Sequence, residues 1–310
     1  MRAHGHRPLF SLFCAVAPVL GCAGTVAGAP GTGDADTPAT NAVVLVERTL
    51  DATEGSRAEA SARFIRVAGS STAGALQTIG ASLDLPPPGS CASVTSLAAG
   101  TPSDGAERAL IELADVGSVS IDTGDALARL APRQVPDVTD VVSGVVYARA
   151  ADPSLFPAGV RYVVHVTGGP DLDPIEASAR APADPTDVHL AGEDGHGGAQ
   201  LASGAPIEFD WPAGSAVGGD ILYADVRPLG GSGVRCVLLP GDDAAGSSSD
   251  SPNPGPARAV VPAAALFDEH GAFTEGTVLI HRVHRETFRA RGLDSGEVRF
   301  DFARSIAYRR

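Results

Sequence analysis

The chain has 310 residues, which is long enough for two ordinary domains. Its formal net charge of −14 argues against a general nucleic-acid-binding protein and against electrostatic binding to anionic lipid. Its 37 glycines and 24 prolines, with few aromatic residues, favour many turns and short strands over long helices.

The first 22 residues have the pattern of a secretory signal. Arg2 and Arg7 precede an apolar run over 9–20, which small residues follow. The run is shorter than the roughly 20 apolar residues that a bilayer-spanning helix needs. The segment 19–22, Val-Leu-Gly-Cys, resembles the lipobox of bacterial lipoproteins, and this resemblance implies cleavage before Cys22 and a lipid on its thiol. An ordinary signal peptide with a chance cysteine is the alternative.

We therefore expect residues 1–21 to be a lipoprotein signal peptide and 22–42 to be a flexible tether, because residues 23–42 are small, polar and interrupted by glycine and proline. The membrane is an expected partner, to which the protein binds through its N-terminal lipid, since two or three acyl chains suffice for stable attachment. Ala23 stands where an aspartate would retain a lipoprotein at the inner membrane in some bacteria. The outer membrane is therefore the favoured location.

The first half beyond the tether is rich in short β-prone runs. Strands are expected at 43–48, 61–67, 109–113, 116–121, 142–149 and 161–167. In the last of these, Tyr162, Val164 and Val166 alternate with residues of the other face. Only 51–62 and 125–130 have room for a turn or two of helix.

The prolines at 182 and 185 predict a joint at 181–185, because they favour an extended chain and discourage strand continuation. Further strands are expected at 206–211, 220–226, 233–239, 258–261, 277–284 and 297–303. Short strands at regular spacing, with turns between them, predict a mainly β protein. We expect two β-sandwich domains of immunoglobulin or fibronectin type in series, at 43–180 and 181–310.

A series of strand and turn positions occurs at 207–212, 220–226, 234–236, 260–264, 279–282 and 296–304, with 142–147 in the first half. In these positions the chain resembles a group of uncharacterised lipoproteins from myxobacteria and related deltaproteobacteria, the second half matching their C-terminal part. The likeness lies in strand and turn positions. It implies an envelope location and a β fold but no reaction. The loop at 242–256 departs from it, because a short polar turn is expected there.

Cys91 and Cys236 are the cysteines that remain outside the signal and the lipidation site. In an oxidising compartment they have one possible pairing, which would clamp the two expected domains together. The alternative is a buried free thiol, above all for Cys236, which lies in a strand-like run.

Motifs for catalysis or metal binding are weak. The sequence contains no G-x-S-x-G, HExxH or CxxC motif. His281 and His284 are three apart in a β-prone run, so their side chains are expected on opposite faces. Residues 193–198 place two acids and a histidine in a glycine-rich loop, which we interpret as a solvated turn. We expect no catalytic residue, no metal and no cofactor.

Trp211 and Tyr223 are the candidate ligand contacts, although a single tryptophan in a sandwich is more often part of the core. The favoured function is a membrane-anchored, non-catalytic structural, adhesive or binding module, whose partner is an envelope protein or polysaccharide. A glycan-binding module that uses Trp211 and Tyr223 is the first alternative. An unrecognised secreted hydrolase is the second.

Overall fold

The computed structural model describes residues 39–68, 72–98, 110–138, 142–170, 172–212, 219–229, 231–239, 257–263, 267–268, 271–272 and 275–310. The expected signal peptide with Cys22, nearly all of the tether and the loop at 242–256 lie outside these residues. Contacts group Asp36–Arg310 into one compact unit. Among the described residues, no helix has the length and apolar character needed to cross a membrane.

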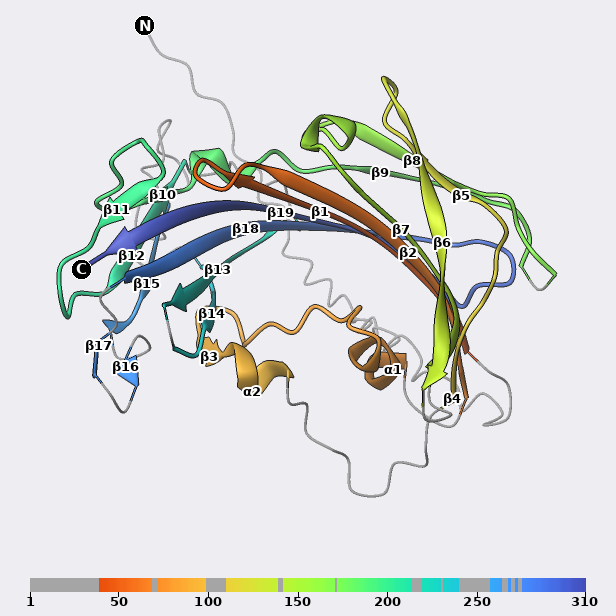
Figure 1. The fold of residues 1–310 in the computed structure, drawn as a ribbon, viewed down its shortest axis with the longest axis horizontal. Coiled ribbons are helices and arrows are strands. Elements are labelled where there is room, and N and C mark those ends of the chain that lie inside the picture. The colour runs from red at the N-terminus through yellow and green to blue at the C-terminus, as the bar shows by residue number, and fades with distance from the viewer. Residues whose placement is uncertain are drawn as a thin grey trace, which may run out of the picture. The chain divides into compact units, whose positions relative to one another are not determined.

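One large mixed sheet of 14 strands dominates the fold (Figure 1). Its strands are β1 (Ala39–Asp51), β2 (Arg57–Ala68), β3 (Cys91–Ser93), β4 (Leu110–Leu113), β5 (Val119–Asp122), β6 (Leu127–Val138), β7 (Val142–Ala151), β8 (Arg161–Val166), β9 (Ile175–Arg180), β11 (Gly198–Gln200), β13 (Ile221–Pro228), β14 (Val234–Val237), β18 (Glu275–Phe288) and β19 (Ser295–Arg309). Their order is β3-β14-β13-β18-β19-β1-β2-β4-β7-β6-β5-β8-β9, and β11 also pairs with β19.

Smaller elements complete the described part. A second sheet has the order β10-β12-β15, and β16 pairs with β17. These strands are β10 (His189–Leu190), β12 (Ile207–Trp211), β15 (Ala257–Val261), β16 (Phe267–Asp268) and β17 (Gly271–Ala272). The helices are α1 (Thr72–Thr78) and α2 (Val94–Ala98), with the 3-10 turns η1 (Pro153–Leu155) and η2 (Pro185–Asp187). The mainly β prediction is confirmed.

The prediction of a turn or two of helix within 51–62 and 125–130 is wrong. Residues 57–62 belong to β2, and residues 127–130 belong to β6. In β2 the buried Ala58, Ala60 and Ala62 recur at every second position, which fits a strand against a core. Alanine has no strong preference for strands, so tertiary packing decided this segment.

Two hydrophobic cores lie along one face of β19, which we call the core face. Val298, Phe300 and Phe302 belong to the first core, with residues of β1, β2, β5, β8 and β9. Ile306 and Tyr308 belong to the second core, with residues of β12, β13, β15 and β18. The layering is sandwich-like around each core, but both cores rest on the same long strand.

The expected division into two domains is not confirmed. β1 pairs in parallel with β19 from Asn41–Ser295 to Asp51–Ser305, so strands from both expected domains are neighbours in one sheet. The predicted joint nevertheless marks a real transition, because Ala181 packs in the first core and Val188 in the second.

One buried arginine and two half-buried ones hold this crossing segment between the two cores. Arg48 pairs with Asp184 at 2.9 Å, and Arg282 pairs with Asp187 at 2.7 Å. Arg304 binds the carboxylate of Glu193. Arg282 precedes the first-core part of β18, and Arg304 stands between Phe302 and Ile306 on β19. A charge that is removed from water needs a paired charge. These ion pairs therefore occupy the boundary between the two apolar cores.

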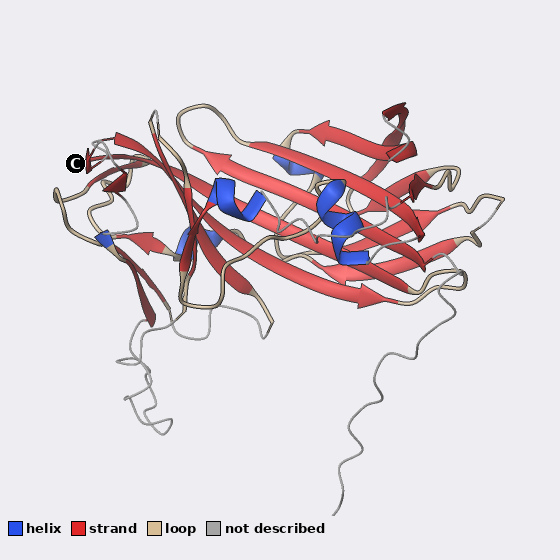
Figure 2. Ribbon diagram, turned by 90° about the horizontal axis from the view of Figure 1, so that it is seen from below, coloured by secondary structure: helices blue, strands red, loops and turns tan. Residues whose placement is uncertain are grey.

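The other face of β18 and β19, which we call the opposite face, is covered by the segment 72–98. Figures 1 and 2 show α1 and α2 on this side of the sheet. Leu83 and Leu85 pack against Tyr223 and Val283, and two backbone carbonyls of the segment bind buried arginines. Arg235 donates to the Asp84 carbonyl at 3.0 Å, and Arg299 donates to the Ala81 carbonyl at 2.9 Å.

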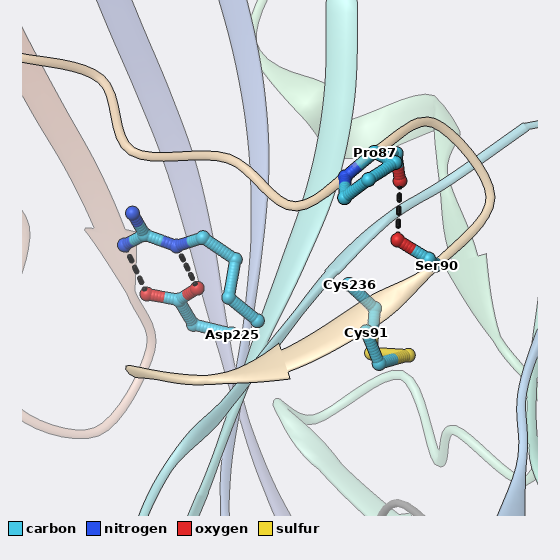
Figure 3. The surroundings of a disulfide bond; sticks show 6 residues. Pro87, Ser90, Cys91, Asp225 and Cys236 are labelled. Carbon is cyan, nitrogen blue, oxygen red and sulfur yellow. Dashed lines mark hydrogen bonds and ion pairs between the residues drawn. A yellow bond between two sulfur atoms is a disulfide. The ribbon is translucent and has the colours of Figure 1, made fainter. Parts of the chain in front are cut away.

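A disulfide joins Cys91 to Cys236 (Figure 3). The two residues pair directly across β3 and β14, with their Cα atoms 4.1 Å apart. The bond therefore links neighbouring strands of one sheet and does not clamp two domains. It secures the end of the covering segment to the strand beside Tyr223.

Candidate functional site

The opposite face carries a cluster of buried polar side chains at its centre. Asp301 accepts hydrogen bonds from the Tyr223 hydroxyl and from Nδ1 of His281, each at 2.7 Å. The rings of Tyr223 and His281 are stacked, with centroids 4.2 Å apart. Burial alone would raise the pKa of Asp301, but the positive charge and hydrogen bond of His281, with the Tyr223 hydroxyl, lower it.

Asp225 forms the second half of this cluster and lies on β13, the strand that also carries Tyr223. Its carboxylate binds Nε of Arg235 at 2.7 Å and Nη2 of the same side chain at 2.9 Å (Figure 3). Arg227 adds a third hydrogen bond at 3.2 Å. Burial opposes ionisation of Asp225, but these arginine contacts and His281 outweigh it and lower its pKa. One buried carboxylate thus anchors two guanidinium groups, of which that of Arg227 is half exposed.

Beyond this cluster the opposite face hollows out. On β19 the side chains of this face become smaller, from Arg299 and Asp301 to Ala303, Ser305 and Ala307. On β18 the small Thr277 lies on the same face as the larger His281. These small side chains leave a hollow of about 440 Å³. The turn between β1 and β2 forms one wall, and Arg227 belongs to another. The volume is in the range of small-molecule sites.

A second hollow of about 600 Å³ adjoins the first. The two share Thr53, Gly197, Thr277 and Ala307, and we call them together the groove. Gly197 has a φ of 87°, and an added Cβ would lie 2.9 Å from the Cβ of Ala52. Only glycine allows this backbone conformation and this close approach between the two walls.

The acids of the groove walls are held by their own turns. Asp51 accepts from the backbone N–H of Thr53 and of Glu54, each at 2.8 Å, and also from the Thr53 hydroxyl. Burial would raise the pKa of Asp51, but these bonds and one from Ser305 lower it to about 2. Asp194 likewise accepts from the N–H of His196 at 2.7 Å and of Gly198 at 3.1 Å, which lowers its pKa. The glycine-rich loop at 193–198 is thus a hydrogen-bonded turn. It forms a wall of the groove.

The two candidate ligand contacts are buried. Trp211 is 4% exposed and packs in the second core, and Tyr223 is 1% exposed and lies under the covering segment. Neither ring is available as a platform for a ligand, so the prediction of ligand contact at these residues is wrong. The physical reason is the strand alternation, which turns Trp211 inward with Ile207 and Phe209.

The histidines of β18 lie as the period-two pattern predicted. His281 pairs with Asp301 on the opposite face, whereas Nδ1 of His284 lies 2.7 Å from Asp220. His284 also contacts Glu286 at 3.3 Å. Among the residues that the structure describes, no three His, Cys, Asp or Glu side chains are grouped to hold a metal ion.

Comparisons with known proteins add little. No protein-family model matches the chain, and no curated protein matches it. Among solved structures, the chain is similar to the Mu homology domain of Fcho1 from Danio rerio with a bound Eps15 peptide, at 8% identity and a TM-score of 0.27. That match covers 88% of this chain and 97% of the other. A similarity at this TM-score identifies neither the family nor the function of this chain.

Sequence reasoning missed the groove residues and the polar cluster. Asp51, Arg227 and Ser305 come from three strands and meet only in the sheet. One signal was present in the sequence, namely the position of Arg299 and Asp301 between large apolar residues of one strand. A charged residue in that position commonly faces solvent, so the pattern alone did not indicate burial.

Proposed function

We propose that this protein is an envelope lipoprotein, anchored through a lipid on Cys22, whose folded part is a non-catalytic binding module. The observation that carries the binding role is the groove, a polar recess on the rigid strands β18 and β19 with two hydrogen-bonded turns as walls. Its volume is in the range of ligand pockets, and loops held by a sheet commonly carry binding residues.

Two observations support the location. The lipobox-like segment at 19–22 precedes a stretch that suits a tether, and the outer membrane is the favoured attachment site. The bond between Cys91 and Cys236 fits an oxidising compartment, where disulfides persist. An envelope protein or polysaccharide is the proposed partner class.

The anchor is tested by the mass of the N-terminal fragment of the native protein after extraction from membranes. We expect a fragment that begins at Cys22 with the added mass of two or three acyl chains. A Cys22→Ala variant should lose this adduct and, unlike the lipidated protein, should be released from membranes by repeated washing without detergent. An unmodified fragment that begins elsewhere would contradict the anchor.

The binding role is tested with the full-length Cys22→Ala variant, which separates binding by the folded part from anchoring by the lipid. We expect this variant to sediment with isolated envelope fragments, and a groove-filling Thr277→Trp change in the same chain to abolish sedimentation. Equal sedimentation of both chains would contradict a binding role for the groove.

A further inference from the structure

We propose that the groove binds a neutral, hydroxyl-rich ligand of the saccharide class. This inference rests on the proposed function and names the ligand of the same site. It does not use Trp211 or Tyr223, which are buried. It follows from the size of the groove, the sign of its charges and the way in which those charges are held.

The first step is the size of the recess. Thr277, Ser305 and Ala307 form a floor of small side chains. The same face is filled by His281, two same-face positions after Thr277 on β18, and by Asp301, two same-face positions before Ser305 on β19. The two hollows of about 440 and 600 Å³ adjoin. Each hollow lies within the range of about 300 to 1,000 Å³ that pockets for small ligands span, which suits a ligand of the size of a short oligosaccharide.

The second step is the balance of charge. The first hollow carries the acids Asp51 and Glu54 and the bases Arg57 and Arg227. The second carries Asp194 and Glu275 beside Arg309 and His196. A ligand with a strong net charge would be attracted by one set and repelled by the other. A hydroxyl group suits both, because it donates to a carboxylate and accepts from a guanidinium.

The third step is the rigidity of these polar groups. Arg227 is held by the buried Asp225, and that carboxylate is fixed by both donors of Arg235. The Asp51 carboxylate is fixed by the N–H groups of its own turn. Planar polar groups in set positions discriminate between hydroxyl arrangements with little loss of conformational entropy on binding.

The fourth step is an apolar contact for the C–H face of a sugar ring. Leu229 is 72% exposed and belongs to the second hollow, and Leu279 belongs to the first. An exposed leucine beside a polar recess offers the contact that the buried aromatic rings do not.

The test uses the full-length lipidated protein in detergent and isothermal titration with three sets of oligosaccharides. The sets are neutral hexose oligomers, uronic acid oligomers and glucosamine oligomers, which are neutral, anionic and cationic. We expect binding to a neutral set, with at least tenfold weaker binding to the charged sets. Preference for a charged set, or no binding to any of the three, would overturn the saccharide inference.

Matched variants place the binding in the groove. Thr277→Trp fills its floor, and Thr287→Trp is the control, because Thr287 is exposed on the same strand and the same face but outside the groove. We expect at least a tenfold loss for Thr277→Trp and no change for Thr287→Trp. Arg227→Gln, which keeps the fold of the floor, should also weaken binding about tenfold. Unaltered affinity in both groove variants, with folding verified by circular dichroism, would place the ligand elsewhere and overturn the inference.

The two proposals fail differently. If no oligosaccharide binds but Thr277→Trp still abolishes sedimentation of the Cys22→Ala chain with envelope fragments, the ligand class is wrong and the binding module stands. If Thr277→Trp leaves sedimentation unchanged as well, the proposed binding function is wrong.

Discussion

The core face and the opposite face of β19 are formed by alternating residues of one strand, yet they are stabilised in different ways. On the core face, Phe300 is fully buried and meets Tyr162 and Phe302 edge to face, with ring centroids 5.0 and 6.0 Å apart. On the opposite face, Asp301 is held by two hydrogen bonds from Tyr223 and His281. The first face depends on buried apolar area and the second on specific partners.

This difference separates the part of the fold that packs apolar side chains from the part that holds polar groups in set positions. Apolar packing is not directional and tolerates similar shapes, whereas a buried carboxylate is stable only with its donors in place. The cluster around Asp301 and Asp225 therefore positions groups, including Arg227 in the groove wall. The core face supplies the bulk of the stability.

The largest effect should come from the core face. We expect Phe300→Ala to lower the free energy of unfolding by about 3–5 kcal/mol, because it removes buried apolar area and leaves a cavity. Denaturant unfolding measures this loss. Phe288→Ala is the matched control on β18, where the side chain is only partly buried against the same core, and its loss should be clearly smaller. Equal losses would contradict the assignment of Phe300 to the centre of the core.

The next effect should come from the disulfide that secures the covering segment. We expect the double change Cys91→Ser and Cys236→Ser to cost about 2–4 kcal/mol, since the bond closes a long loop in the unfolded chain. Hydrogen exchange should accelerate in β19 through global unfolding, and more strongly over 79–93, because the end of the covering segment is also released locally. Reduction of the unaltered protein with dithiothreitol is the control and should give the same pattern. Uniform acceleration would mean that the bond supports the whole sheet.

A smaller effect, with its own pH dependence, is expected for Asp301→Asn. Loss of the charged acceptor should cost about 1–3 kcal/mol at neutral pH. Because the folded pKa of Asp301 lies below its ordinary value of 3.8, its charge stabilises the fold above that value, and this contribution is lost as the pH falls through the folded pKa.

Unfolding between pH 2 and pH 7 measures this contribution. The variant should be less sensitive to acid than the unaltered protein, whereas Phe300→Ala should shift the whole profile in parallel. An unchanged slope in Asp301→Asn would contradict the pKa direction.

The smallest effect is expected for Tyr147→Phe, which removes a polar group of β7 from the first core, the core that Phe300 also joins. The Tyr147 hydroxyl donates to Asp115 at 2.7 Å and accepts from the N–H of Val116 at 2.9 Å. We expect a loss of about 1 kcal/mol, measured by denaturant unfolding. A loss as large as that of Phe300→Ala would mean that the core face depends on specific partners as well.

The sequence predicted which side chains share a face of a strand better than it predicted which segments pack against that face. In the strand predicted at 297–303, Val298 and Phe300 alternate with Arg299 and Asp301 in the sequence, and the structure places the two pairs on opposite faces. The same reasoning did not predict that Arg299 is buried, because its cover comes from Ala81, far away in the chain. The ring of Trp211 was similarly undecided, since a strand end can face a core or solvent.

By itself, the sequence determined the mainly β character and the positions of most long strands, because each strand is predicted from the alternation of apolar and polar residues within its own segment. Only the tertiary structure decided which strands became neighbours. The parallel pairing of β1 with β19, the meeting of Tyr223 with Asp301 and the groove floor at Thr277 and Ser305 all join segments distant in the chain. Such contacts depend on the packing of whole layers, and no local pattern encodes them.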